Sequence, residues 1–119
     1  MRWQFAGSEP VYQQIMEKIR FAVLTGEYPA GSRVPAVREW AMAAGVNPNT
    51  MQRALSELER EGLLVCCGTL GRFVADDEAV LSRCRRTVQQ AAVSACIHQL
   101  SAVGLTLEQA LALQKEENL

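Results

Sequence analysis

The sequence has no long hydrophobic run, and charged and polar residues interrupt its N-terminal stretch. A helix that spans a bilayer needs about 18 consecutive apolar residues, and a secretory signal needs an apolar centre. We therefore expect neither a membrane segment nor an export signal, and a cytoplasmic protein.

Patterns typical of metal binding and catalysis are also missing. His98 is the single histidine, and the cysteines Cys66, Cys67, Cys84 and Cys96 form no C-x-x-C pair. Zinc sites depend on such spacing, so we expect no metal or other cofactor, and free thiols as in other cytosolic proteins. No nucleophile stands with a base and an orienting group, which argues against an enzyme.

Net positive charge is absent as well. Twelve Lys and Arg residues against 13 Asp and Glu give a formal charge of −1. Because affinity for DNA depends largely on cations that neutralise phosphates, a DNA-binding role would need basic side chains placed locally. With 119 residues, 49% of them hydrophobic and 21% charged, the chain suits one small globular domain with an appended helical segment.

Glycine, proline and capping residues divide the first 62 residues into helices. Ser8-Glu9-Pro10 predicts a helix start with Ser8 as the N-cap, and Gly26 predicts its end. A loop with a short strand at Arg33-Val34 should follow, and then a helix over residues 36–44. Asn47 is expected to cap a third helix that ends at Gly62. Two helices joined by a three-residue link form a helix-turn-helix.

Two short apolar runs follow, Leu63–Cys67 and Arg72–Ala75. The sequence Gly68-Thr69-Leu70-Gly71 between them is typical of a hairpin turn. We therefore expect a β-hairpin wing after the helix-turn-helix. The predicted fold is mainly α with a small β wing, and residues 1–75 form its winged helix-turn-helix domain.

Residues 76–119 are expected to be helical. A long helix should end near Gly104, and Thr106-Leu107-Glu108-Gln109 is a capping box that opens a last short helix. One side of the long helix carries apolar residues that the small winged domain should not cover: Leu81, Cys84, Val88, Ala92, Ala95 and Leu100. We expect these residues to form a homodimer interface, so that 76–119 are C-terminal dimerisation helices. The alternative is that the long helix docks on its own winged domain.

Several short motifs occur in order and without gaps between residues 8 and 75. They are Pro10–Ile15 (PVYQQI), 26–35 (GEYPAGSRVP), 37–39 (VRE), 45–50 (GVNPNT) and 55–63 (LSELEREGL). Together they resemble the DNA-binding domain of the GntR family of transcription regulators, and specifically its short YtrA-like branch.

The resemblance implies that the second helix of the motif enters the major groove and that the wing reaches the minor groove. Arg38 would anchor the DNA backbone. The other DNA-binding residues implied are Asn47, Asn49, Thr50, Gln52 and Arg53 near the start of the third helix, and Thr69, Gly71 and Arg72 in the wing. The implied function is a repressor that binds an inverted-repeat operator in double-stranded DNA as a homodimer, with its effector unknown.

The chain departs from the family at two places. Gln52 stands where a second basic residue is common, and the wing reads Cys67-Gly68-Thr69-Leu70 where relatives are often basic. Arg72 is therefore the only wing cation that we expect, and the wing should act mainly by shape.

Three alternatives stay open. A winged helix can serve as a protein-interaction module without DNA binding. Arg53 could pair with Glu57 at helical spacing instead of touching DNA, and Asn47 could act only as a cap. Cys66 and Cys67 could sense redox state, although we favour packing of both thiols within a wing strand.

Overall fold

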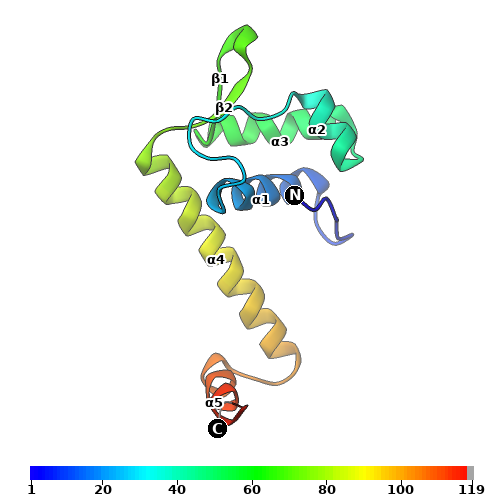
Figure 1. Ribbon diagram of the computed structural model, residues 1–119. Coiled ribbons are helices and arrows are strands. Elements are labelled where there is room, and N and C mark those ends of the chain that lie inside the picture. The colour runs from blue at the N-terminus through cyan, green and yellow to red at the C-terminus, as the bar shows by residue number, and fades with distance from the viewer. Residues whose placement is uncertain (118–119) are drawn as a thin grey trace. The chain divides into compact units, whose positions relative to one another are not determined.

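The computed structural model describes residues 1–117 and shows mainly helices with one small sheet (Figure 1). The elements are α1 (Val11–Leu24), α2 (Val37–Ala44), α3 (Pro48–Arg60), β1 (Leu64–Cys66), the 3-10 turn η1 (Gly68–Leu70), β2 (Arg72–Val74), α4 (Glu78–Ala102) and α5 (Leu107–Glu117). This order confirms the predicted fold class, a helix-turn-helix with a wing followed by C-terminal helices. No helix among the described residues has the length and apolar character needed to cross a membrane.

The chain divides into two compact units, Met1–Val88 and a C-terminal unit that begins at Gln89. The first unit extends beyond the wing because the first turns of α4 contribute to its core. Buried Cys84 belongs to that core, and Leu81 and Val88 pack against it.

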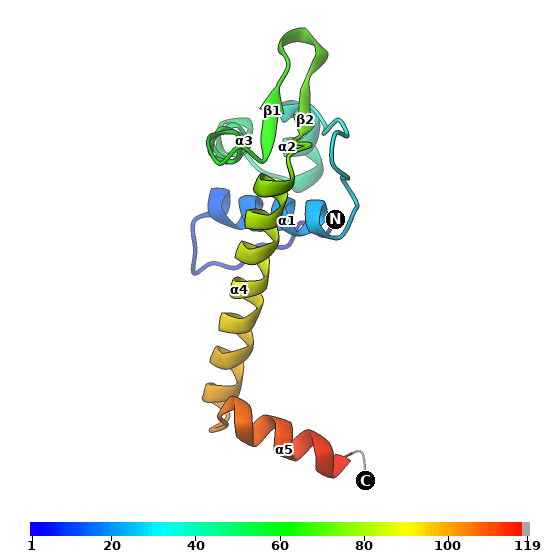
Figure 2. The ribbon, with the colours of Figure 1, turned by 90° about the vertical axis from the view of Figure 1, so that its left-hand side faces the viewer.

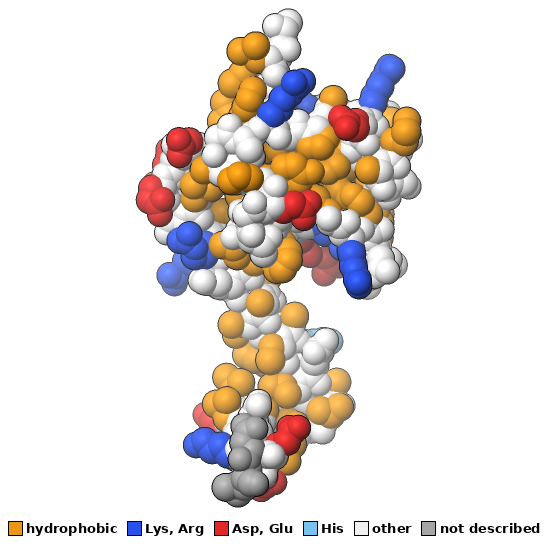
Figure 3. Space-filling model, viewed as in Figure 1, with side chains coloured by type: hydrophobic (Ala, Val, Ile, Leu, Met, Phe, Trp, Pro, Cys, Tyr) orange, Lys and Arg blue, Asp and Glu red, His pale blue; other side chains and the backbone are white. Residues whose placement is uncertain are grey.

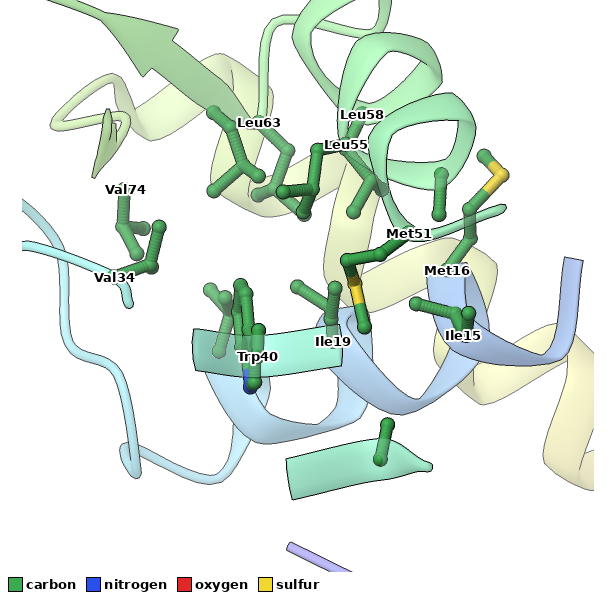
Figure 4. Close-up of a cluster of buried hydrophobic side chains, with 14 of the residues drawn as sticks. Ile15, Met16, Ile19, Val34, Trp40, Met51, Leu55, Leu58, Leu63 and Val74 are labelled. Atoms are coloured by element: carbon green, nitrogen blue, oxygen red, sulfur yellow. The ribbon is translucent and has the colours of Figure 1, made fainter. Parts of the chain in front are cut away.

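The core of the first unit lies between α1, α2 and α3 (Figure 4). On α3 the apolar side chains of Met51, Ala54, Leu55 and Leu58 recur at helical spacing, and all four are fully buried. Burial of one such large side chain contributes about 1.5–3 kcal/mol to folding. This buried stripe fixes the rotation of α3, so the residues on its opposite side must face solvent.

Local signals set most helix ends as expected. The Asn47 side chain accepts a hydrogen bond from the Asn49 backbone N–H at 2.8 Å, with Pro48 as the first residue of α3. Gly45 ends α2 in the left-handed conformation, with φ of 68°. Thr106 and Gln109 exchange the two hydrogen bonds of a capping box, at 2.9 and 3.1 Å.

The start of α1 differs from the prediction. Pro10 occupies the N-cap position and no side chain caps the helix, so Ser8 does not have the expected role. Instead Gln14, which is only 8% exposed, bonds in both directions to the backbone of Ala6 and donates to the carbonyl oxygen of Glu9. One amide supplies both donor and acceptor to the preceding loop and so ties that loop to the helix, but it caps none of the free N–H groups of α1.

The wing is an antiparallel pair in which Leu64 faces Val74 and Cys66 faces Arg72. Figure 2 shows this hairpin projecting beyond α2 and α3. The short strand expected near Arg33 is present as a bridge between Arg33 and Phe73. Cys66 and Cys67 are both exposed, so the expectation that they pack within the wing was wrong. Both stand next to the wing turn, whereas the buried residues Leu64 and Val74 lie at the other end of the hairpin. Redox sensing by this pair stays a hypothesis.

Candidate nucleic-acid interface

The solvent face of α3 is polar. Asn49, Gln52 and Arg53 lie opposite the buried stripe and are exposed, and Asn47 is exposed just before the helix. Thr50 is half-buried where α3 meets the rest of the motif. A helix that carries amide and guanidinium groups along one exposed side can offer hydrogen bonds to base edges and phosphates.

Arg53 is held by an aromatic ring from α1. Its guanidinium carbon Cζ lies 3.8 Å from the centre of the Tyr12 ring. Glu57 pairs instead with Arg60 at 3.5 Å, so the alternative Arg53–Glu57 pair is not formed. Stacking limits the motion of the guanidinium but leaves its in-plane N–H donors available for phosphate oxygens.

Arg38 projects from the first turn of α2 and is exposed. Among residues 1–117, no carboxylate forms an ion pair with it. A cation without an internal partner is free to contact an anion from outside the protein.

The basic groups of the wing differ from the expectation of a single cation. Arg72 on β2 forms an ion pair with Glu59 of α3 and is therefore partly neutralised within the protein. A second cation comes from outside the hairpin, because the Arg33 side chain lies directly against Gly71. Both arginines line a groove of about 260 Å³ between the wing and the start of α2. Only the tertiary structure brings Arg33 to the wing, since 38 positions separate it from Gly71 in the sequence.

Gly71 has a backbone conformation that is nearly exclusive to glycine, with φ of 108° and ψ of −165°. A Cβ atom at this position would lie 2.9 Å from Nε of Arg33. We expect Gly71→Ala to lower the free energy of unfolding by roughly 1–3 kcal/mol, because the backbone would be strained and Arg33 would have to move. Urea denaturation measures this change.

Gly68→Ala is the matched control for this variant. Gly68 also has positive φ, 59°, but no heavy atom lies within 4 Å of the position that an added Cβ would occupy. Its conformation is the ordinary left-handed one, so the expected cost is only about 1 kcal/mol. Equal losses in the two variants would contradict the special role of Gly71.

The residues expected in the dimer interface fall into two groups. Leu81 and Val88 are half-buried against the core of the first unit, and Cys84 is 8% exposed with its Sγ 3.8 Å from the Arg20 carbonyl oxygen. Burial raises the pKa of the Cys84 thiol, with smaller contributions from nearby charges. For these three residues the structure shows the alternative, docking on the chain's own winged domain.

The other three residues of the expected interface lie in the C-terminal unit. Ala92 and Ala95 are exposed, and Leu100 is half-buried. The expectation missed the large exposed side chains of this part of α4, Val93 and Ile97. At about 100° per residue they point roughly 140° and 180° away from Val88 around the helix axis. A search for a second apolar face on the same helix would have found them.

Comparison with known proteins agrees with this geometry. The sequence pattern described as "Bacterial regulatory proteins, gntR family" matches residues 11–74. The transcriptional regulator YhcF of Bacillus subtilis is 33% identical over 108 residues, which cover 91% of this chain and 89% of YhcF. The repressor YtrA of the same organism is 36% identical over 70 residues, which cover 59% of this chain and 54% of YtrA.

Solved structures give the same result. A GntR family transcriptional regulator from Listeria monocytogenes superposes with a TM-score of 0.79 at 30% identity, covering 94% of this chain and 98% of the other. The DNA-binding domain of AraR in complex with operator ORR3 has a TM-score of 0.54 at 31% identity, covering 60% of this chain and 90% of the other. These relatives are regulators and not enzymes, and the chain itself, with its helix-turn-helix, its wing and its matched motifs, belongs to the GntR family of DNA-binding transcriptional regulators.

Proposed function

We propose that this regulator is a repressor that binds an inverted-repeat operator as a homodimer, with α3 in the major groove of each half-site. The observation that carries the proposal is the exposed face of α3, where Asn49, Gln52 and Arg53 lie opposite the buried stripe. In this arrangement Arg38 holds a phosphate, and Asn47 and Thr50 contact the backbone near the start of the helix.

The wing contributes at the edge of this surface. Thr69 and Gly71 belong to its turn, which offers a hydroxyl and backbone groups to the DNA. Arg33 supplies a cation there, whereas Arg72 is engaged by Glu59. In this proposal the charge of the wing therefore comes mainly from Arg33.

The C-terminal helices are assigned to dimerisation. Between Gln89 and Glu117 no residue is buried, although Val93, Ile97, Leu107 and Leu111 are large and apolar. Hydrophobic side chains cover much of the visible face of this unit (Figure 3). Exposed large apolar side chains gathered in this way are typical of an interface, and a second copy also supplies the second recognition helix that an inverted repeat requires.

This assignment divides the chain by function. Residues 1–75 bind DNA and residues 76–119 carry the dimer. Leu81, Cys84 and Val88 tether α4 to the winged domain, and Ala92, Ala95 and Leu100 lie in the interface with Val93 and Ile97. Repression as the outcome rests on the relatives YtrA and NagR of Bacillus subtilis, both named as transcriptional repressors.

Selection of bound fragments from genomic DNA tests the proposal. We expect a site with two half-sites related by a dyad and separated by a whole number of helical turns, about 34 Å each. Log affinity should fall with log salt by roughly 0.9 for each phosphate contacted. A protein-interaction module would show no enrichment of any sequence and no measurable affinity for duplex DNA, which would overturn the proposal.

A further inference from the structure

Arg72 connects the base of the wing to the recognition helix. Its side chain is 18% exposed and forms an ion pair with Glu59 through Nε. Its terminal nitrogen Nη2 lies 3.4 Å from Oε1 of Gln52, so it donates to the amide of a residue on the exposed face of α3.

The amide of Gln52 is held at its other end too. Its Nε2 donates to the Ser56 hydroxyl at 2.9 Å. Gln52, Ser56 and Glu59 follow one another at spacings of four and three, so they form one row along α3. Arg72 spans this row from the wing, and both polar atoms of the Gln52 amide have a protein partner.

An arginine placed in this way is poorly suited to phosphate binding. The Glu59 carboxylate satisfies its Nε donor, and the same negative charge repels a phosphate that would approach the guanidinium. The position at the wing base therefore does not make Arg72 an electrostatic contact for DNA.

We propose that Arg72 is a positioning residue, which fixes the orientation of the Gln52 amide and thereby sets which base pair α3 prefers. A glutamine contact with a base depends on the direction of its amide, because oxygen accepts and nitrogen donates. A free glutamine would sample both directions and several rotamers. The inference rests on the proposed function, since it requires α3 to face the bases.

The test uses the full-length protein and the operator obtained by genomic selection. Dissociation constants are measured for that duplex and for a set with every single base-pair change in one half-site. The proteins are wild type, Gln52→Ala, Arg72→Ala and the double variant. Each is also titrated with salt on the operator and on an unrelated duplex.

Gln52→Ala should lose its preference at one or two adjacent base pairs by a factor of roughly 5 to 100. Arg72→Ala should lose most of the same preference, although it does not itself touch a base. The double variant should be no worse than Gln52→Ala, because both changes remove one coupled contact. The salt slope of Arg72→Ala should equal that of the wild type.

Two further variants keep the test decisive. Arg83→Ala removes one exposed arginine from α4, outside the helix-turn-helix and the wing, and should leave the preference unchanged. Glu59→Gln removes the ion pair that holds Arg72 and should weaken the preference at the same base pairs. This variant tests the inference independently if Arg72→Ala fails to fold.

The inference is overturned if Arg72→Ala keeps the full base-pair preference of the wild type. It is also overturned if the slope of log affinity against log salt becomes shallower by about 0.9 for each arginine removed, as expected for a lost phosphate contact. Wild-type protein that shows no base preference would instead overturn the proposed function. Loss of preference in Gln52→Ala together with an unchanged Arg72→Ala would overturn this inference alone.

Discussion

Ile97→Asp is expected to convert the protein to a monomer and to weaken operator binding by a factor of roughly 10²–10⁴. Ile97 is 47% exposed and Val93, one helical turn earlier on α4, is 54% exposed. In the proposed dimer both side chains are buried against the second copy, where an unpaired carboxylate would lose its hydration. Without the dimer, each subunit must bind its half-site independently. The gain in affinity from linking two recognition helices is then lost.

Sedimentation equilibrium at micromolar concentration measures the assembly state, and DNA titration measures the affinity. Ser82→Asp is the matched control, because Ser82 is exposed on α4 outside the proposed interface and the substitution adds the same charge. It should remain dimeric. Wild-type protein that is monomeric under these conditions would contradict the proposed dimer.

The position of the substitution on α4 decides how the result is interpreted. Val88 lies on the same helix but packs against the core of the winged domain. A charge at Val88 would destabilise the DNA-binding domain as well as any interface. Ile97 is not part of the core of the first unit and does not pack against it. Its replacement should therefore leave the free energy of unfolding of the winged domain unchanged.

Arg38→Ala is expected to weaken binding to operator and unrelated DNA by the same factor. A charge-assisted hydrogen bond is worth about 1.5–3 kcal/mol, or roughly 10-fold to 100-fold in affinity. A dimer carries two copies of Arg38, so the combined loss should be roughly 10²–10⁴. Phosphates are present in every sequence, which is why no change in base preference should follow.

Salt titration distinguishes this role from a structural one. Each lost phosphate contact should make the slope of log affinity against log salt shallower by about 0.9. Arg83→Ala serves again as the control, because it removes the same positive charge as Arg38→Ala. Thermal unfolding shows whether the variants remain folded. Unchanged affinity in folded Arg38→Ala would remove Arg38 from the proposed interface.

The sequence predicted those features that depend on neighbours along the chain. Asn47 caps α3 and Thr106 opens α5 because each cap joins atoms only two or three residues apart. The stripe of Met51, Leu55 and Leu58 reflects the period of the helix itself, and the motifs between residues 8 and 75 correctly indicated the GntR family. Such signals are local, so they can be interpreted without a structure.

Contacts between distant segments required the tertiary structure. Gln14 bonds to the backbone of Ala6, eight positions earlier, because the loop before α1 folds back over the helix, and no side chain caps α1. Tyr12 stacks on Arg53, and Arg33 reaches Gly71, although about 40 positions separate the members of each pair. No periodicity predicts these pairs, because each depends on how two elements pack.

The same distinction applies to charge and to the two faces of α4. The sequence by itself determined that the wing turn has no lysine or arginine of its own, and that the long C-terminal helix carries apolar residues at helical spacing. Only the tertiary structure decided that Glu59 engages Arg72, that Arg33 lies at the wing, and that Cys84 is buried within the winged domain. The physical reason is that composition and spacing specify which side chains lie along each element. Packing between elements specifies which of those side chains already have a partner within the protein.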